Sequence, residues 1–190
     1  MSDKKFNPIN KNKLNNPERL KFLPPETMIK ALNLENPKNI VDYGAGTGFF
    51  TYYFAEKFPK ARLFALDIEP AMIEELENTL DFDNLFALEI SDNEMPFGEN
   101  SIDAVWCIAV YHEMQTPEVW LNNVYKTLTK GGKLLIVDWD KNQDPKYSAG
   151  PPIDHRIDDK EILQILKDIG FSKISRVDGL LNHFGIVAEK

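Results

Sequence analysis

Short apolar runs alternate with longer amphipathic segments along most of the chain. An apolar run of four to eight residues is typical of a buried β-strand, whereas apolar residues three or four apart predict one face of a helix. The sequence therefore predicts strands at 39–43, 62–66, 85–89, 102–107 and 133–139. By the same criterion it predicts helices at 25–32, 48–58, 70–80, 117–128 and 159–169.

Turn and capping residues mark the ends of several of these helices. Pro70 suits a first helical turn, because its φ is already helical and its missing N–H has no partner there. Thr116 is expected to cap the helix that follows it, and Asp158 with Glu161 forms a capping-box pattern. Gly170 is a typical helix stop.

The order of these elements predicts the fold class. Strands that alternate with helices form βαβ units, which build a mostly parallel sheet covered on both faces. From Lys173 onward two strands follow each other around Asp178 and Gly179 with no helix between them, so the last strand is expected to be antiparallel. The prediction is an α/β, Rossmann-like, doubly wound sheet. The connection 140–157 is long for a compact domain, which favours a functional or mobile loop.

Composition and charge define the domain organisation. The chain has 190 residues, 43% of them hydrophobic, which suits one domain with a sizeable core. Its net charge of −8 argues against a DNA-binding surface. The first 21 residues hold six basic and two acidic side chains, so the remainder carries about −12 in formal charge. We expect a basic N-terminal arm over 1–24 and a single domain over 25–190.

Several other classes of protein are disfavoured by the residues present. One cysteine, Cys107, excludes an internal disulfide and a cysteine-built metal site. Zinc proteases use H-E-x-x-H, but His112-Glu113 is followed by Thr116 where the second histidine would stand, so no metal is expected. No apolar run is long enough for a membrane span, and the lysine-rich start does not resemble a signal peptide. The expected location is cytoplasmic.

The segment "VDYGAGTGFF", residues 41–50, holds the first candidate chemistry. Gly44, Gly46 and Gly48 alternate between a predicted strand and a predicted helix, where glycines allow a tight turn and close approach of a ligand. The spacing differs from the dinucleotide pattern G-x-G-x-x-G. Asp42 would repel a pyrophosphate, whereas a carboxylate favours the cationic ammonium and sulfonium of S-adenosylmethionine. By itself a glycine-rich turn is weak evidence of a ligand.

The end of the next strand adds a second carboxylate. Asp67 comes 25 positions after Asp42, and a carboxylate there can accept hydrogen bonds from both hydroxyls of a ribose. Ile68 follows it and suits the flat face of an adenine. The alternative is that Asp67 caps the helix beginning at Pro70.

With these segments in place the chain resembles a known family. "VDYGAGTG", "ALDIEPAM", "SDNEMPFGENSIDAVWCIAVYHEM", "TLTKGGKLLIVDW" and "GPPIDHRI" are similar to class I S-adenosylmethionine-dependent methyltransferases. The similarity is greatest to the ubiquinone/menaquinone-methyltransferase-like group, with its type 11 methyltransferase domain. The resemblance covers about residues 40–157. It implies a seven-stranded sheet with a reversed last strand, and S-adenosylmethionine bound over the first two strands.

The resemblance also implies cofactor-binding positions. In addition to the glycine turn and Asp67 with Ile68, it places Asp92 and the Asn93 backbone at the adenine edge and Ile108 at the methionyl group. The whole set of expected cofactor residues is Asp42, Gly44, Ala45, Gly46, Gly48, Asp67, Ile68, Asp92, Asn93 and Ile108.

Residues after the fourth and fifth strands are candidates for the acceptor side. His112 is expected either to act as a general base or to orient the nucleophile, and the alternative is a loop histidine bonded to backbone. Tyr111, His155 and Arg156 are expected to contact the acceptor. Arg156 could instead pair with Asp154 or Asp158 and only fix its loop.

The expected function is methyl transfer from S-adenosylmethionine to a small-molecule acceptor. A nucleic-acid amino-methyltransferase would carry an Asp/Asn-Pro-Pro-aromatic run after the fourth strand, where this chain has "CIAVYHEM". Two alternatives stay open. One is a non-catalytic S-adenosylmethionine-binding or scaffold module, and the other is a protein or RNA methyltransferase that uses the basic arm.

Overall fold

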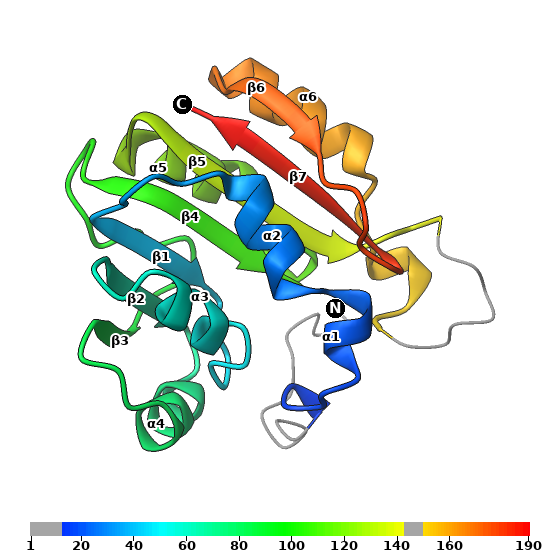
Figure 1. Cartoon of the computed structure of the whole chain (residues 1–190). Helices are drawn as coiled ribbons and strands as arrows, with labels where there is room; N and C mark the ends of the chain where they lie inside the picture. Colours follow the sequence, from blue (N-terminus) through cyan, green and yellow to red (C-terminus); the bar gives the residue numbers. More distant parts are fainter. Residues whose placement is uncertain (1–12, 143–149) are drawn as a thin grey trace.

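The computed structural model describes residues 13–142 and 150–190 (Figure 1). Its strands form one seven-stranded sheet in the order β3-β2-β1-β4-β5-β7-β6. The strands are β1 (Asn39–Tyr43), β2 (Arg62–Asp67), β3 (Leu85–Glu89), β4 (Ile102–Ile108), β5 (Leu128–Trp139), β6 (Ser172–Arg176) and β7 (His183–Glu189).

Strand direction follows from how the strands are connected. β1 to β5 are parallel to one another, and β7 is antiparallel to both β5 and β6. The α/β, doubly wound prediction with a reversed last strand is therefore confirmed. The chain order reverses between β1 and β4, which are adjacent in the sheet. In open α/β sheets this switch point opens a ligand crevice at the carboxyl ends of the strands.

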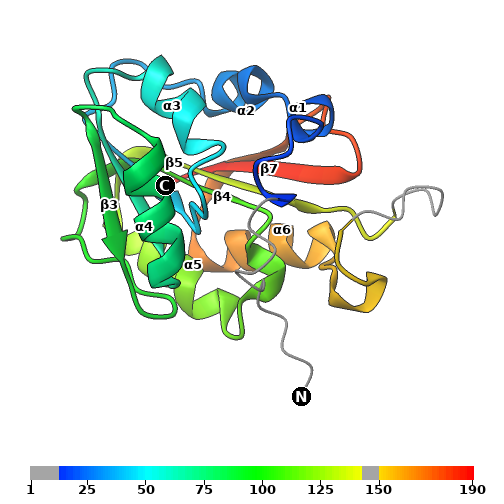
Figure 2. The same ribbon diagram turned by 90° about the horizontal axis from the view of Figure 1, so that it is seen from below.

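Helices cover both faces of this sheet (Figure 2). They are α1 (Arg19–Phe22), α2 (Pro25–Leu32), α3 (Thr51–Lys57), α4 (Pro70–Thr79), α5 (Pro117–Thr127) and α6 (Asp159–Ile169), with short 3-10 turns η2 (Tyr111–Glu113) and η3 (Ile153–His155). Figure 2 shows α2 and α3 on one face and α5 and α6 on the other. Each face packs its own apolar cluster.

Aromatic contacts join the helices to the central strands. On one face Phe54 of α3 stacks on Trp106 of β4, with ring centroids 4.0 Å apart. On the other face the ring centroids of Trp120 of α5 and Tyr43 of β1 are 5.0 Å apart. All these side chains are buried, so β1 and β4, which frame the switch point, are fixed from both sides.

Some helix ends differ from the sequence prediction. The helix expected from Gly48 begins only at Thr51, because positive φ angles at the three turn glycines hold the chain outside the helical region. Thr116 occupies the N-cap of α5, but its side chain does not cap the helix; its hydroxyl accepts from Asn93 Nδ2 at 2.8 Å. Asp158 does cap α6, accepting from the Lys160 amide at 3.0 Å.

The N-terminal segment and the long loop are described only in part. Residues 1–12 of the expected arm and residues 143–149 of the connection lie outside the described residues. Within residues 13–24, α1 leads to Leu23, which is buried in the cluster that packs against α2 and α3. In the part of the chain that the structure describes, no helix is long and apolar enough to cross a bilayer.

Candidate functional site

A cavity of about 770 Å³ opens at the carboxyl ends of the parallel strands. Its walls come from the ends of β1, β2, β4 and β5, the start of β7, the glycine turn and residues of the N-terminal segment. The volume lies within the range of about 300–1,000 Å³ that is usual for small-molecule sites. The cavity therefore lies at the switch point that the strand order creates.

The glycine turn fits tightly between β2 and the segment after β4. Gly44 and Gly46 have φ of 72° and 56°, a left-handed region that favours glycine. A Cβ atom on Gly44 would lie 2.5 Å from Val110 Cγ2. Gly44, Ala45 and Gly46 line the cavity, whereas Gly48 is not among its lining residues. A Cβ atom on Gly48 would meet Leu80 Cδ1 at 2.7 Å, so this glycine allows close packing beside α4.

The backbone N–H groups of the turn have partners inside the protein. Gly44 and Ala45 donate to the Leu66 carbonyl at 2.8 and 2.9 Å, and Gly46 donates to Asp67 Oδ2 at 2.8 Å. Gly48 donates to the Ala45 carbonyl at 3.0 Å. A phosphate cradle aims such N–H groups at its anion. Here these four are engaged elsewhere, which disfavours a pyrophosphate at this turn.

Asp67 stands at the end of β2 with its carboxylate in the cavity wall. Oδ2 accepts from Gly46 N, and Oδ1 accepts from Glu69 N at 3.0 Å. Burial raises the pKa of Asp67, while these two amides lower it. The N-cap of α4 is Glu69, so the alternative that Asp67 caps this helix is wrong. Each carboxylate oxygen has a further lone pair for a ligand hydroxyl.

Asp42 lies deeper, at the end of β1, and also lines the cavity. It is 3% exposed, and its Oδ2 accepts from the Thr51 hydroxyl at 2.7 Å. Burial raises its pKa to about 7, a shift that the Thr51 hydrogen bond opposes. A cation beside Asp42 would stabilise the ionised form.

The raised pKa of Asp42 gives a testable pH dependence of stability. Because its pKa is about 7 in the fold and about 4 in an unfolded chain, the folded state binds the proton more tightly. Its contribution to the free energy of unfolding is therefore present below pH 4 and lost as pH rises to 7. We expect Asp42→Asn, which keeps the Thr51 hydrogen bond, to remove this loss of stability between pH 4 and 7.

The measurement is thermal unfolding of both proteins between pH 4 and 8 without ligand. Relative to the Asn variant, wild type should become less stable as pH rises. Burial lowers the pKa of His183 to about 4, which has the opposite effect on stability, but His183 is present in both proteins and cancels in the difference. If the difference in stability between the two proteins stayed constant from pH 4 to 8, Asp42 would not titrate in that range.

The residues expected near adenine, which are Ile68, Asp92 and Asn93, all line the cavity. Ile108, expected at the methionyl group, lines it as well. Asn93 adopts φ of 61°, and its carbonyl accepts from Asn123 Nδ2 at 3.0 Å. With the Thr116 contact described above, Asn93 is held from both its backbone and its side chain.

His112 is tied to Asp138 at the cavity wall. Nδ1 lies 2.8 Å from Asp138 Oδ1, and the His112 backbone N–H donates to Oδ2 at 3.0 Å. Asp138 is 1% exposed at the end of β5, so both contacts are shielded from water. Because an ionised carboxylate only accepts hydrogen bonds, Nδ1 carries the proton and Nε2 is the basic nitrogen. Glu113 Oε1 lies 3.7 Å from Nε2.

The structure does not bring the three expected acceptor residues to the cavity. Tyr111 is 1% exposed, because η2 turns its side chain into the core. Its ring centroid lies 6.1 Å from that of Trp120. Neither Tyr111, His155 nor Arg156 is among the lining residues. Arg156 donates to the carbonyls of Pro151 and Asp140 at 3.1 and 3.0 Å. Tyr111 therefore packs away from the cavity, and Arg156 ties its own loop together.

Several side chains that were not among the predicted site residues also line the cavity, among them Arg19, Trp139 and His183. Arg19 comes from α1, Trp139 ends β5 and His183 begins β7. The rings of Trp139 and His183 are 4.1 Å apart. His183 Nδ1 donates to the Leu181 carbonyl at 2.8 Å, so with its lowered pKa the neutral ring keeps Nε2 as an acceptor. Trp139 lies at the end of a parallel strand, whereas only long-range packing brings Arg19 and His183 to this edge of the sheet.

Within residues 13–142 and 150–190, no three His, Cys, Asp or Glu side chains gather closely enough to hold a metal ion. The cavity instead combines the carboxylates of Asp42 and Asp67 at the strand ends, a histidine fixed by the buried Asp138, and apolar walls. This arrangement can bind a ligand with positive charge and ribose hydroxyls, and can accept a proton beside it.

Comparison with known proteins agrees with this geometry. Residues 41–136 match the family described as "Methyltransferase domain", type Methyltransf_11, which is about half of the chain. A solved S-adenosylmethionine-dependent methyltransferase from Aquifex aeolicus superimposes with a TM-score of 0.88 and 27% identity, covering 97% of this chain and 98% of that one. The chain belongs to the class I S-adenosylmethionine-dependent methyltransferases. S-Adenosylmethionine is the cofactor of this family.

Curated relatives differ in length and in acceptor. A malonyl-[acyl-carrier protein] O-methyltransferase from Hahella chejuensis is 33% identical over 101 residues, which are 52% of this chain and 36% of that protein. A ubiquinone/menaquinone biosynthesis C-methyltransferase from Rhizobium meliloti is 24% identical over 189 residues, covering 79% of this chain and 71% of that protein. The chain thus spans about a third of the length of the Hahella enzyme.

Proposed function

We propose that this protein transfers a methyl group from S-adenosylmethionine to a small-molecule nucleophile. The observation that carries the proposal is the His112–Asp138 pair, whose histidine lines the same cavity as the glycine turn and Asp67. The proposed cofactor-binding wall and a candidate proton acceptor thereby face one cavity.

The residues of the cavity have distinct roles in this proposal. Asp67 accepts hydrogen bonds from the ribose, Ile68 contacts the adenine, and Asp42 faces the positive charge of the methionyl end. The bound cofactor supplies a methyl group on a positively charged sulfur, which is already activated for displacement. The walls exclude water and align the nucleophile opposite the sulfur.

His112 supplies the proton transfer. Asp138 holds the ring through Nδ1, so Nε2 can take the proton from an O–H or N–H nucleophile as it attacks. The same carboxylate then stabilises the imidazolium that forms. An acceptor that is already ionised would need only the positioning role of His112.

The size of the cavity and similarity to known proteins support a small acceptor. The cavity measures about 770 Å³, and the N-terminal segment, Trp139 and His183 contribute to its walls. The Rhizobium relative is named for ubiquinone and menaquinone biosynthesis, and the Hahella relative for a malonyl group on a carrier protein. The buried His112–Asp138 contact favours catalysis over a non-catalytic binding module, because cofactor binding alone does not require it.

Calorimetry with S-adenosylhomocysteine and NAD tests the cofactor part of this proposal. We expect saturable binding of S-adenosylhomocysteine and no heat from NAD, because Asp42 and the engaged turn amides disfavour a pyrophosphate. NAD binding without an S-adenosylhomocysteine signal would contradict the proposal.

Incubation with methyl-labelled cofactor and a metabolite extract tests the acceptor part. A labelled low-molecular-weight product is expected, and its mass identifies the acceptor. Label found only in protein or RNA would reassign the acceptor to a macromolecule.

A further inference from the structure

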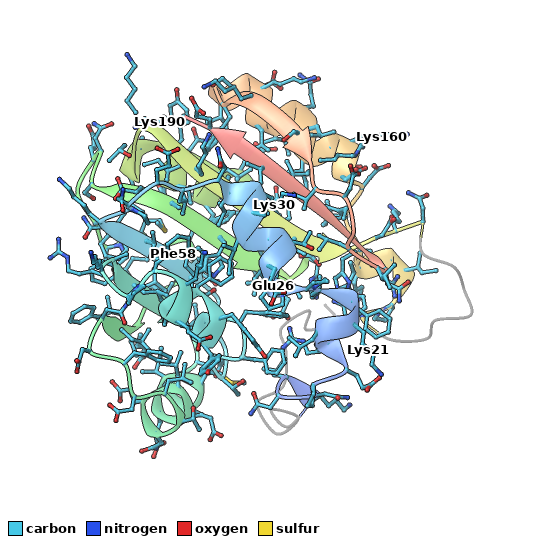
Figure 3. All side chains as sticks on the ribbon, in the orientation of Figure 1. Lys21, Glu26, Lys30, Phe58, Lys160 and Lys190 are labelled. Carbon is cyan, nitrogen blue, oxygen red and sulfur yellow. The ribbon has the colours of Figure 1, made fainter. Side chains whose placement is uncertain are left out.

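Arg19 is a cation from the N-terminal segment placed inside the cavity wall. Its guanidinium lies 4.6 Å from the Phe50 ring and 5.2 Å from the Phe49 ring, both just after the glycine turn. Lys21, labelled in Figure 3, lies on the same helix but is exposed and pairs with Glu18 at 2.7 Å. The two cations of α1 therefore have different environments.

The position of Arg19 is fixed from both sides. Its Nη1 donates to the Leu14 carbonyl at 2.6 Å, and its own carbonyl accepts from the Leu23 amide at 2.8 Å. Leu23 is buried in the core. The preceding residues are tied to the glycine turn, because the Thr47 hydroxyl donates to Asn15 Oδ1. Arg19 is thus built into the wall beside the turn.

The environment of Arg19 calls for an anion. Burial lowers its pKa to about 10, and the nearby Asp42 charge opposes this shift, so the group stays charged at neutral pH. A guanidinium carries five N–H donors. Among the described residues, the Leu14 carbonyl is its one hydrogen-bond partner. Unused donors in a cavity wall match the fork geometry of a carboxylate.

We infer that Arg19 binds the carboxylate of the methionyl group of S-adenosylmethionine, an inference that rests on the proposed function. The amino-acid end of the cofactor is a zwitterion, with an ammonium and a carboxylate on one carbon. Asp42 and Arg19 face the same part of the cavity with opposite charges, and each influences the pKa of the other. Asp42 takes the ammonium and Arg19 the carboxylate.

This contact makes the N-terminal segment part of the cofactor site. Arg19, Leu14 and Phe22 all line the cavity, although they precede the first strand of the sheet. Binding the carboxylate joins this segment to the turn through the ligand. The segment then closes the methionyl end against water, which strengthens the charge contacts there.

Calorimetry with two ligands tests the inference. S-Adenosylhomocysteine carries the amino-acid group, whereas 5′-methylthioadenosine has the same adenosine and sulfur without it. In Arg19→Met the dissociation constant of S-adenosylhomocysteine should rise about 10- to 100-fold, as expected for a lost charge-assisted hydrogen bond. That of 5′-methylthioadenosine should stay within about two-fold. Lys21→Met removes a positive charge from the same helix and should change neither constant.

The two ligands also distinguish the ways in which this inference could fail. If Arg19→Met weakened the binding of both ligands equally, Arg19 would only support the cavity wall. Arg19→Lys, which keeps the charge, would then bind both ligands like wild type. An unchanged S-adenosylhomocysteine affinity would refute the carboxylate contact and leave the proposed function standing. Wild-type protein that binds neither ligand would refute the proposed function and this inference together.

Discussion

Replacing His112 with alanine should lower kcat by about 10²- to 10⁴-fold and leave the affinity for S-adenosylhomocysteine nearly unchanged. The reason is that His112 Nε2 is the basic nitrogen oriented by Asp138, while the proposed cofactor contacts come from other residues of the cavity. The measurement is steady-state kinetics with the acceptor identified by methyl labelling, together with calorimetry of the same variant.

Two further variants separate proton transfer from positioning. Asp138→Asn should also lower kcat, because an amide no longer stabilises the imidazolium. It should alter the acid limb of the pH–rate profile, a change that a packing defect alone would not produce. Glu113→Gln removes the charge 3.7 Å from Nε2 and should have a much smaller effect. A raised KM with wild-type kcat in His112→Ala would assign His112 to orientation of the acceptor.

Local patterns predicted most of the sheet well because its strands, apart from β5, are short and separated by clear turn signals. β5 begins at Leu128, five residues before the predicted strand. β1 and β3 begin and end where the apolar runs do. The helix predicted from Gly48 was too long at its start. Three alternate glycines with φ of 72°, 56° and 81° keep the chain turning, and hydrophobicity alone does not show this. Backbone conformation, not apolar spacing, sets the start of α3.

The residues of the candidate site also fall into two groups, those that the sequence could bring together and those that only the fold brings together. Asp42, Asp67 and the glycines lie at strand ends, and strand ends meet at one sheet edge, so the sequence could group them. Arg19 joins this group only because α1 folds back across the cavity, and His183 only because β7 runs antiparallel beside β5. Tyr111 and His112 are neighbours in the short 3-10 turn η2, yet Tyr111 packs into the core and His112 lines the cavity, a difference that the sequence does not show.

Replacing Asp67 with alanine should weaken S-adenosylhomocysteine binding by about 1–3 kcal/mol, or roughly 5- to 150-fold in the dissociation constant. The carboxylate is expected to accept from the ribose while it also accepts from the Gly46 and Glu69 amides. Its loss removes the ligand contact and also leaves two backbone N–H groups of the cavity wall without their acceptor. Calorimetry on the folded variant measures the effect.

Asp103 offers a matched control for the backbone part of this effect. Its Oδ2 accepts from the Lys38 and Asn39 amides at 2.6 and 3.0 Å, at the opposite end of the sheet. Asp103→Ala therefore also deprives two amides of an acceptor, but it does not touch the cavity. Both variants should unfold at lower temperature than wild type, and only Asp67→Ala should lose ligand affinity. Equal affinities in a folded Asp67→Ala and in wild type would restrict Asp67 to holding the glycine turn.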